Sequence, residues 1–571
     1  MAAPKLKMRL GDLLVHEHII TNEQLMQALN SQKTTGRKLG DTLIELGHIG
    51  ERQLQEFLAQ QLNVPFLDIS QRRIPNEVAL LLPEVHARRL RALIIEDQGE
   101  SVLLGMSDPA DLSGLDQLER MLSPKRLNLA VVMESQLYEA FDGLYRRTAD
   151  IESFASQLEE EYEQTTDFDL SSTFLDDSGD ATVGKLLQSV FEDAVQMRAS
   201  DIHIEPDENL LRIRQRIDGV LQENILKENK IASAMVLRLK LMAGLDISEK
   251  RLPQDGRFNL QIKGHNIDVR MSTMPVQHGE SVVMRLLDQS AGLLSLDQTG
   301  MPADLVARVR HQITRPHGMV LVTGPTGSGK TTTLYGALSE LNQSTKKIIT
   351  VEDPVEYRLP RINQVQVAPK IDLNFSTVLR TALRQDPDII MVGEMRDHET
   401  VEIGLRGALT GHLVLSTLHT NDAITSALRL IDMGAAGFLV GSSLRAVIAQ
   451  RLVRKICEHC GEDHTPDAQE MMWLTHLAGE QAKTVTYKKG RGCQSCQYSG
   501  YRGRIGVFEL LEMNEPMMAA LKRDDAEAFT KLAKENPSFT PLAQAAFDYA
   551  KLGIISVEEV LRLVDTIDVQ G

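Results

Sequence analysis

The chain has 571 residues, of which 42% are apolar and 25% are charged, a composition that is ordinary for a soluble globular protein. At roughly 150 residues per domain, this length predicts about four domains. The formal net charge of −17 disfavours non-specific binding of nucleic acid, which needs a net basic face. No apolar run approaches the ~18 residues of a membrane span, and the first residues lack the apolar core of a signal peptide, so we expect a cytoplasmic protein.

The N-terminal segment contains an internal duplication. Residues 9–32 and 38–61 align at an offset of 29 with nine of 24 positions identical. Unrelated segments would share about two, so the similarity marks a repeat. Thr21 can cap the helix of the first copy, with Gln24 completing a capping box. We therefore predict two helical hairpins with quasi-twofold symmetry, an arrangement that suits a two-fold symmetric ligand.

The duplicated pattern resembles the cyclic di-GMP-binding N-terminal domain of type II secretion and type IV pilus assembly ATPases. The resemblance implies that Arg9 and Lys38 face phosphate or guanine edges and that leucines line an apolar slot. Two residues depart from the family pattern, because His18 stands where glycine is usual and Lys38 replaces arginine. A helical packing unit without a ligand is the alternative. The ligand residues that the resemblance implies are Arg9, Leu10, Gly11, Asp12, Leu14, Leu25, Leu29, Gln32, Lys38, Leu39, Gly40, Asp41, Leu43, Leu54, Leu58 and Gln61.

Residues 62–145 alternate strand-like and helix-like runs, which predicts a small α+β subdomain completing an N-terminal domain of residues 1–145. Residues 146–184 are predicted to be an acidic linker. The stretch from Thr148 to Gly184 has eleven acidic residues and no lysine or arginine, a composition typical of solvated chain. A docking strip for a basic partner is the alternative interpretation.

A phosphate-binding loop is the strongest single motif of the chain. An apolar strand beginning at Gly318 enters the pattern G-x-x-x-x-G-K-T, and a helix-like run follows. This is the strand–loop–helix context in which backbone N–H groups and a helix N-terminus hold phosphates. Lys330 is predicted to reach the β- and γ-phosphates of ATP, and Thr331 to hold Mg²⁺ through its hydroxyl. The predicted nucleotide-binding residues of the loop are Gly324, Pro325, Thr326, Gly327, Ser328, Gly329, Lys330, Thr331 and Thr332.

Three further apolar strands end in polar residues. Carboxylates beyond strand ends near a nucleotide can hold metal or orient water, and a histidine on a neighbouring strand can sense the γ-phosphate. Taken singly, each has an ordinary structural interpretation as a solvated acid or a hydrogen-bonded histidine. The candidate residues at these strand ends are Glu352, Asp353, Glu356, Glu394, His412 and His419.

Together, in this order, the motifs resemble the Walker A, Asp box, Walker B and His box of the secretion ATPases, over residues 199–512. The resemblance implies that Glu356 is the general base, supported by Glu352 and Asp353. It implies that Glu394 acts on Mg²⁺ through water and that His412 and His419 form the His box. It further implies a hexamer in which a preceding domain supplies arginines to the nucleotide. The candidates for that role are Arg216, Arg270 and Arg285, each of which can instead pair with a nearby carboxylate.

All four cysteines of the chain occur in two C-x-x-C pairs that are separated by 32 residues. Two such pairs predict a tetracysteine zinc site, structural because four thiolates leave no open coordination position. Four free thiols are the alternative. In the family, the element is typical of assembly ATPases and absent from retraction ATPases. The predicted ligands are Cys457, Cys460, Cys493 and Cys496.

These features predict an α/β RecA-like motor over residues 296–571, with the zinc element at 457–496 and a helical C-terminus. A small α+β, PAS-like domain over residues 185–295 precedes the motor and supplies arginines. The expected function is ATP hydrolysis that powers type IV pilus assembly, of the mannose-sensitive haemagglutinin (MSHA) type, under cyclic di-GMP control. The expected cofactors are ATP, Mg²⁺ and Zn²⁺, and the expected partners are a homohexamer and an inner-membrane platform protein. A type II secretion ATPase is second; a nucleic-acid translocase and a nucleotide-binding scaffold with little turnover are more distant alternatives.

Overall fold

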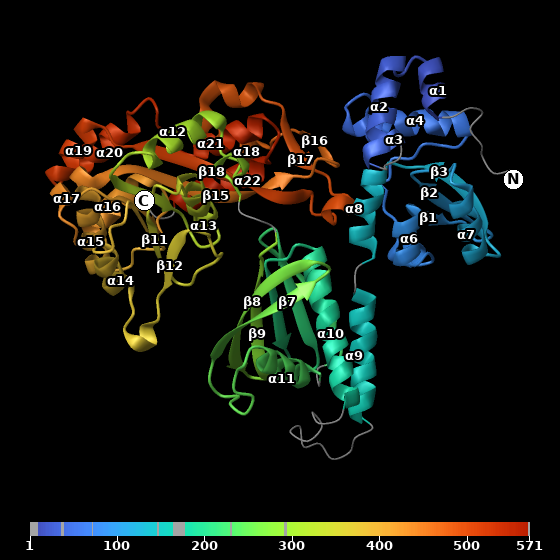
Figure 1. The fold of residues 1–571 in the computed structure, drawn as a ribbon, viewed down its shortest axis with the longest axis horizontal. Helices are drawn as coiled ribbons and strands as arrows, with labels where there is room; N and C mark the ends of the chain where they lie inside the picture. Colours follow the sequence, from blue (N-terminus) through green and yellow to red (C-terminus); the bar gives the residue numbers. More distant parts are fainter. Residues whose placement is uncertain are drawn as a thin grey trace. The chain divides into compact units, whose positions relative to one another are not determined.

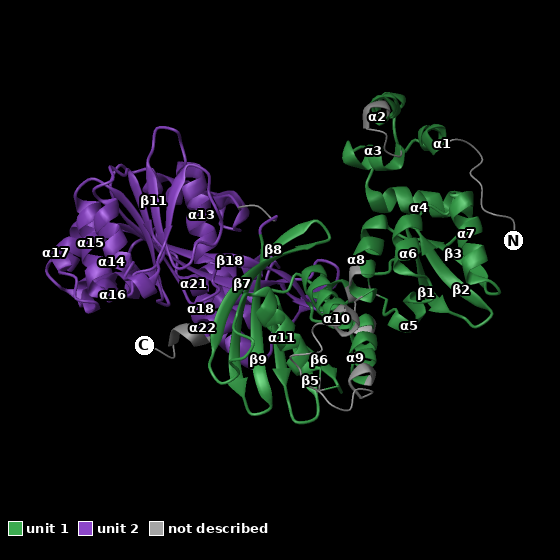
Figure 2. Cartoon of the chain, turned by 60° about the horizontal axis from the view of Figure 1, so that its bottom comes forward, with its two compact units in different colours: residues 1–288, 491–500 green, residues 289–490, 501–571 purple. Residues whose placement is uncertain are grey.

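The structure is a computed structural model that describes residues 10–35, 39–70, 72–145, 148–163, 177–228, 231–290 and 294–568. The chain divides into two compact units (Figure 2). The first comprises Met1–Asp288 and Arg491–Gly500, and the second comprises Gln289–Gly490 and Tyr501–Gly571. Arg9 and Lys38, which the sequence predicts as ligand residues, lie outside the described residues.

The first unit begins with the duplicated segment, which forms two helical hairpins as predicted (blue in Figure 1). The capping box at Thr21 is confirmed. Its backbone N–H donates to Oε1 of Gln24 at 2.8 Å, and the N–H of Gln24 donates to Oγ1 of Thr21 at 3.2 Å. The helices of the first hairpin are α1 (Leu10–His16) and α2 (Asn22–Thr35), and those of the second are α3 (Leu39–Glu45) and α4 (Glu51–Leu62).

A small α+β subdomain follows the hairpins, as the alternating runs predict. Its sheet has the order β1-β2-β3, with β1 and β2 antiparallel and β2 and β3 parallel. A compact apolar core that includes Leu93, Leu104 and Phe141 holds the sheet against the helices. The strands are β1 (Ala92–Asp97), β2 (Ser101–Met106) and β3 (Arg126–Val131), and the helices are α5 (Asn76–Ala79), α6 (Glu84–Leu90), α7 (Leu112–Leu122) and α8 (Glu134–Leu144).

Much of the predicted acidic linker is helical, which corrects the sequence-based expectation. Helix α9 (Thr148–Glu163) buries Ile151, Ala155 and Leu158, and it packs on α10 (Asp177–Gln196). These three apolar side chains are spaced by four and three residues, so they share one helix face. Burial of that face stabilises the helix in spite of the acidic composition of the segment. Residues 177–184 of the predicted linker begin α10, and residues 146–147 and 164–176 lie outside the described residues.

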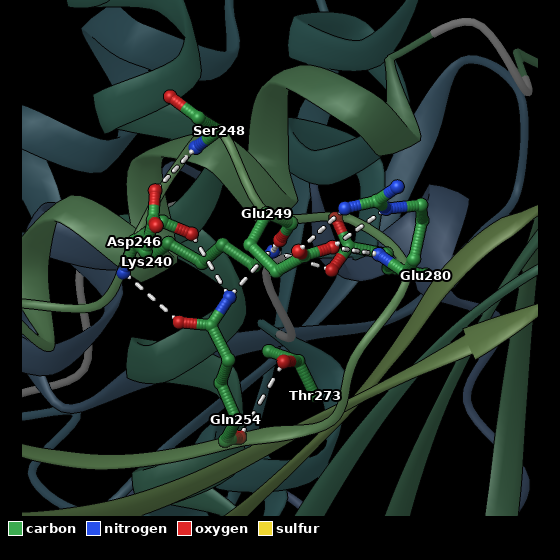
Figure 3. A network of polar contacts seen from close by, with 8 residues as sticks. Lys240, Asp246, Ser248, Glu249, Gln254, Thr273 and Glu280 are labelled. Carbon is green, nitrogen blue, oxygen red and sulfur yellow. Dashed lines mark hydrogen bonds and ion pairs between the residues drawn. The ribbon is translucent and has the colours of Figure 1, made fainter.

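Helices α9, α10 and α11 (Ala232–Met242) share one apolar core with a six-stranded antiparallel sheet of order β6-β5-β4-β9-β8-β7. At the end of α11 the buried ammonium of Lys240 pairs with the carboxylate of Glu280 and donates to the carbonyl of Glu249 at 2.7 Å (Figure 3). The amide of Gln254 holds the same loop by donating to the carbonyls of Asp246 and Glu249. The strands are β4 (Asp201–Pro206), β5 (Leu211–Ile217), β6 (Val220–Leu226), β7 (Gln254–Ile262), β8 (His265–Val276) and β9 (Gly279–Asp288).

The second unit is built on a seven-stranded sheet of order β12-β11-β13-β14-β10-β15-β18. All neighbours are parallel except β15 and β18, which are antiparallel. This is the predicted RecA-like α/β arrangement, with the phosphate loop after a central strand. The strands are β10 (Gly318–Thr323), β11 (Ile348–Glu352), β12 (Ile362–Gln366), β13 (Ile389–Val392), β14 (Leu413–Leu418), β15 (Leu444–Ile456) and β18 (Tyr501–Glu512).

Helices cover both faces of this sheet. Along β10, Met319 and Leu321 belong to one apolar core, and Val320 and Val322 belong to another. A strand buried on both faces has a continuous apolar run, which is the pattern that the sequence shows before the phosphate loop. The helices are α12 (Ala303–Ile313), α13 (Lys330–Leu341), α14 (Phe375–Ala382), α15 (His398–Leu409), α16 (Ala423–Asp432), α17 (Gly437–Ser443), α18 (Ala468–Ala478), α19 (Glu515–Lys522), α20 (Ala526–Lys534), α21 (Leu542–Lys551) and α22 (Val557–Asp568), with 3₁₀ turns η2 (Leu296–Gln298), η3 (Pro369–Ile371) and η4 (Gly479–Thr484).

A two-stranded antiparallel sheet of β16 (Gly461–His464) and β17 (Tyr487–Gly490) lies between the two cysteine pairs in sequence. Helix α18 and turn η4 connect its strands. The second pair follows, with Cys493 just before the 3₁₀ turn η5 (Gln494–Cys496) and Cys496 at its end. Across the described part of the chain, the structure has no helix with the length and apolarity that crossing a membrane requires.

Candidate functional site

The loop between β10 and α13 has the strand–loop–helix geometry that its sequence predicts. Gly327 and Gly329 have φ values of 79° and 88°, in the left-handed region that favours glycine. A Cβ added at Gly324 would lie 2.5 Å from the carbonyl oxygen of Gln450, so the neighbouring strand leaves room only for glycine. The start of α13 offers backbone N–H groups and the positive end of the helix dipole, a combination that binds phosphate.

Lys330 is folded over this loop. Its Nζ donates to the carbonyl oxygens of Gly324 and Pro325, at 2.7 and 3.1 Å. Burial lowers the pKa of Lys330 to about 8; the carboxylate of Glu394 opposes this shift and the guanidinium of Arg451 adds to it. Burial disfavours the protonated form of this lysine. A phosphate in the loop would favour that form again, because its negative charge stabilises the ammonium.

The predicted carboxylates follow strands that end at the same edge of the sheet as the phosphate loop. Strands β11, β13, β14 and β10 are neighbours and parallel, so their carboxyl ends meet at one edge. Ligands of open α/β sheets bind at such an edge. Topology alone therefore brings the segments after Glu352, Val392 and Leu418 to the loop after Thr323.

Glu394 is held from two sides at this edge. Its carboxylate pairs with the guanidinium of Arg396, and its Oε2 lies 3.3 Å from Nε2 of His419. Its side chain is largely buried, and its charge acts on Lys330 as described above. The structure thus brings Glu394, His419 and Lys330 together, as the combination of motifs predicts.

Glu352 lies in the interior at the end of β11. Its carboxylate accepts hydrogen bonds from the hydroxyls of Tyr335 and Thr350 and from Nε2 of Gln364. This network ties β11 to α13 and β12, so Glu352 positions strands here. Asp353 is exposed beside it. The backbone N–H of Glu356 donates to the hydroxyl of Tyr335 at 3.3 Å, which links the predicted general base to the same network.

His412 does not reach this site. It precedes β14 at the opposite end from the phosphate loop, where its carbonyl accepts from the N–H of Gly318 at 3.1 Å. Its Nδ1 lies 3.0 Å from the carbonyl oxygen of Gly407. A six-residue strand spans about 20 Å, so the two histidines that bracket β14 cannot both lie at the phosphate edge of one chain.

The three candidate arginines lie in one cross-strand row of the six-stranded sheet. Arg216 and Arg285 both stand opposite Asp201, and Arg270 stands opposite Arg285. Asp201 pairs with Arg285 at 3.3 Å and lies 3.6 Å from Arg216. Arg270 lies 3.7 Å from Asp268. The carboxylate pairing considered from the sequence is present, and Arg285 nonetheless keeps more than half of its side chain exposed.

The two helical hairpins repeat their packing as well as their sequence. An added Cβ at Gly11 would lie 2.6 Å from Leu25, and one at Gly40 would lie 3.0 Å from Leu54. Each glycine therefore allows its helix to approach the leucine of the next helix. The eight predicted leucines differ in burial. Leu14, Leu25, Leu43, Leu54 and Leu58 are buried, whereas Leu10, Leu29 and Leu39 are partly buried.

His18 and Gly47 occupy the same turn of the two hairpins. Both have positive φ, 58° at His18 and 70° at Gly47. A left-handed residue is natural for glycine and uncommon for a residue with a side chain. The departure noted in the sequence is therefore a replacement within an unchanged backbone turn. The other predicted polar residues, Asp12, Gln32, Asp41 and Gln61, lie on the hairpin helices.

The four cysteines form one buried cluster. Their sulfur atoms all lie within 4.8 Å of one another, and those of Cys493 and Cys496 are 3.7 Å apart. Backbone N–H groups of Cys493 and Gly500 donate to the sulfur of Cys496, at 3.1 and 3.3 Å. Tetrahedral zinc with Zn–S bonds of ~2.3 Å requires sulfur separations of about 3.8 Å, so the arrangement fits that ion.

Comparison with known proteins decides the family. The family model described as "Type II/IV secretion system protein" matches residues 176–562. The chain belongs to this family. The type IV pilus assembly ATPase PilB of Myxococcus xanthus is 42% identical over 509 residues, which cover 88% of this chain and 89% of that protein. The type II secretion system ATPase E of Vibrio cholerae is 46% identical over 416 residues, covering 73% of this chain and 80% of that protein. An ATP hydrolase is the enzyme class that these relatives establish for this family member.

A second family model, the MshEN domain, matches residues 62–151. The solved structure titled "Structure of MshE with cdg" is 51% identical, covers 24% of this chain and 98% of that chain, and has a TM-score of 0.23. The MshEN match begins where the second hairpin ends, so it covers the α+β subdomain, in which the sequence shows no chemical motif.

The sequence-based reasoning missed a polar pair on β15, Gln450 and Arg451, which is buried beside the phosphate loop of this secretion ATPase. Arg451 donates to the carbonyl oxygens of Gln450 and Asn421 and to Oδ1 of Asn421. The available signal was two polar residues inside an apolar run of β15, residues 446–453. A polar residue in a strand that is buried on both faces needs hydrogen-bond partners, and here residues of the candidate site provide them.

Proposed function

We propose that this chain is a hexameric cytoplasmic ATPase that powers assembly of an MSHA-type type IV pilus under the control of cyclic di-GMP. The observation that carries the proposal is the shared edge at which Lys330, Glu394 and His419 meet the phosphate loop. Family membership over residues 176–562 supports the motor function.

The chemistry that we propose follows from the residues at this edge. Lys330 leaves the loop carbonyls and binds the β- and γ-phosphates, where its charge is fully restored. Thr331 and Glu394 would hold Mg²⁺, directly and through water respectively; the ion neutralises phosphate charge when it is bound. Glu356 orients the attacking water as general base, and His419, beside Glu394, faces the γ-phosphate.

We propose that the arginine row completes the site of a neighbouring subunit. An arginine that reaches the γ-phosphate in trans stabilises the charge that spreads during transfer. Among the three candidates, the exposure of Arg285 supports its role most directly, because its guanidinium can leave Asp201 for a phosphate. If each nucleotide site needs an arginine from the next subunit, the subunits must assemble into a closed ring to complete every site. Hydrolysis at one interface would then change the position of an adjoining domain.

The duplicated hairpins are the proposed receptor for cyclic di-GMP. The repeated Gly11–Leu25 and Gly40–Leu54 contacts support a symmetric site for a two-fold dinucleotide. The match to the MshEN domain covers residues 62–151, which directly follow the hairpins. Leu10, Leu29 and Leu39 are the predicted ligand leucines that are only partly buried and can still gain contact with a ligand. In this proposal, binding of the ligand changes the conformation of the hairpins, and the N-terminal domain transmits this change to the motor.

A structural zinc ion is the proposed occupant of the cysteine cluster. The fit of the sulfur separations and the two N–H···S bonds, which favour thiolates, support it. The partners that we propose are an inner-membrane platform protein and further copies of the chain, at the inner face of the inner membrane.

A type II secretion ATPase that drives a pseudopilus is the second candidate, and the 46% identity to the Vibrio cholerae protein favours it. Deletion of the gene and assay of surface pili and of secreted enzymes separates the two, since only one output should be lost. Purified protein assayed for ATP hydrolysis with cyclic di-GMP, with DNA and with neither tests the motor. We expect turnover without DNA stimulation; stimulation by DNA would favour a translocase, and no turnover would favour a scaffold.

A further inference from the structure

The side chain of Gln450 joins two parts of the phosphate-binding segment. It projects from β15, is 2% exposed, and uses both ends of its amide group. Its Nε2 donates to the carbonyl oxygen of Ser328 at 2.7 Å, and its Oε1 accepts from Oγ1 of Thr333 at 2.7 Å. One rigid amide group thus bonds the loop before Gly329 and the first turn of α13.

The residues between these two anchors are those that face phosphate. Gly329, Lys330 and Thr331 lie between Ser328 and Thr333, and their backbone N–H groups stand at the start of the helix. A carbonyl held at Ser328 fixes the peptide plane that it shares with the N–H of Gly329. The hydrogen bond to the carbonyl of Ser328 therefore also sets the direction of the N–H of Gly329, which points from the opposite edge of the same peptide group.

Strand β15 also contacts the glycines of the loop. An added Cβ at Gly324 would lie 2.5 Å from the carbonyl oxygen of Gln450, and one at Gly329 would lie 3.1 Å from its Nε2. The loop is therefore pressed against this residue at both of its ends. Most buried glutamines only satisfy their own hydrogen bonds in a core, but Gln450 uses both of its bonds to hold the phosphate-binding segment.

We propose that Gln450 is a positioning residue of the phosphate loop, which holds the backbone N–H groups of the loop in the orientation that binds the phosphates of ATP. It acts through Ser328 and Thr333 and does not touch the nucleotide. The inference rests on the proposal that this loop binds ATP, and it adds to that proposal a residue more than a hundred positions away in the sequence.

Kinetics of full-length variants test this role. Gln450→Leu removes both bonds at similar volume, Thr333→Val removes one hydroxyl, and Thr333→Ser keeps that hydroxyl. Gln312→Leu is the matched control, because Gln312 is also buried in the same unit and bonds Glu512 instead of the loop. Melting temperature, KM for ATP and kcat are measured for each variant.

We expect Gln450→Leu to raise KM about tenfold while kcat stays within about threefold, because the loop N–H groups hold phosphate similarly in the ground and transition states. Thr333→Val should raise KM less than Gln450→Leu does, and Thr333→Ser should keep the wild-type KM. A double variant with Gln450→Leu and Thr333→Val should match Gln450→Leu alone, since the two bonds act as one unit. Gln312→Leu should lower the melting temperature without changing KM.

An unchanged KM in Gln450→Leu, or a rise equal to that of Gln312→Leu, overturns the inference. If Gln450→Leu does not fold, Thr333→Val against Thr333→Ser decides, and equal KM values in these two overturn it. Lys330→Ala distinguishes the positioning role from the binding site. Loss of ATP binding in Lys330→Ala with no effect of Gln450→Leu removes only the positioning role, whereas wild-type binding in Lys330→Ala removes the proposed site itself.

Discussion

Nε2 of His419 lies 3.3 Å from Oε2 of Glu394. This contact joins the residue that follows β14 to the segment that follows β13, and both segments adjoin the phosphate loop. Arg396 holds the same carboxylate from another side. Two neighbours thus hold the Glu394 carboxylate, and a fixed orientation is what the Mg²⁺-positioning role proposed for Glu394 requires.

Glu394→Gln should slow turnover and spare ATP binding. The substitution keeps the shape of the side chain and removes the charge that faces the metal and Lys330, so we expect kcat to fall on the order of 10²-fold. Single-turnover hydrolysis and binding of a fluorescent ATP analogue measure the two effects separately. His419→Ala leaves Arg396 in place and should reduce kcat less. A wild-type kcat in Glu394→Gln would show that this carboxylate takes no part in catalysis.

Glu352 and Glu356 should respond differently to the same substitution. Glu352→Gln breaks a buried network with Tyr335 and Thr350, because the amide NH2 replaces one of the two oxygens and presents a donor to a hydroxyl that itself donates. We expect the free energy of unfolding to fall by about 1–3 kcal/mol. Glu356→Gln should leave the melting temperature unchanged and abolish turnover. Melting curves and kcat for both variants check this pair, and full activity of Glu356→Gln would identify another residue as the base.

The local signals of the sequence predicted the motor and the hairpins well. A strand, a glycine-rich loop and a helix follow one another within about 30 residues, and the capping box at Thr21 lies within about four, so neither depends on distant packing. A shared site for Lys330 and Glu394 was also expected, because the motifs that contain them occur in the order that resembles the secretion ATPases.

The features that could not be predicted depend on tertiary packing. His412 and His419 bracket one strand, and only the direction of that strand relative to β10 shows which end faces the loop. The acidic segment of α9 forms a helix because Ile151 and Leu158 find a core that is built from distant strands. Gln450 is separated from Ser328 by 122 residues, so no local pattern connects them.

Binding of ATP should take up protons near pH 8. The pKa of Lys330 without nucleotide is about 8, and phosphate charge raises it, so binding converts neutral lysine into ammonium. Proton uptake on ATP binding is small below about pH 7, where Lys330 is already protonated. It grows to roughly half a proton at about pH 8, where half of the lysine is neutral before ATP binds. Calorimetry in two buffers with different ionisation enthalpies measures it. Lys330→Arg, which keeps its charge, should bind without this uptake, and equal heats in both buffers for the wild type would contradict the prediction.

Purified protein should contain one zinc ion per chain. Because the four sulfurs lie within 4.8 Å of one another and all four cysteines are buried, removal of the metal leaves four thiols enclosed together. Cys460→Ser should therefore destabilise the segments around the cysteines by several kcal/mol, as expected where metal binding is coupled to local folding. Metal analysis and chelator-dependent melting check this. Four titratable thiols in a metal-free protein that melts normally would exclude the zinc site.

The burial of the hairpin leucines separates ligand contact from stability. Leu14 and Leu43 are 0% exposed, so Leu14→Ala should lower the free energy of unfolding by about 2–5 kcal/mol whether or not ligand is present. Leu10 and Leu39 are partly buried and can gain contact, so Leu10→Ala should weaken cyclic di-GMP binding by roughly 1–3 kcal/mol with little effect on stability. Calorimetry with cyclic di-GMP and with GMP on the full chain, beside melting curves, measures both. Equal binding of the two nucleotides, or equal stability losses for Leu10→Ala and Leu14→Ala, would show that the hairpins are a packing unit and not a dinucleotide receptor.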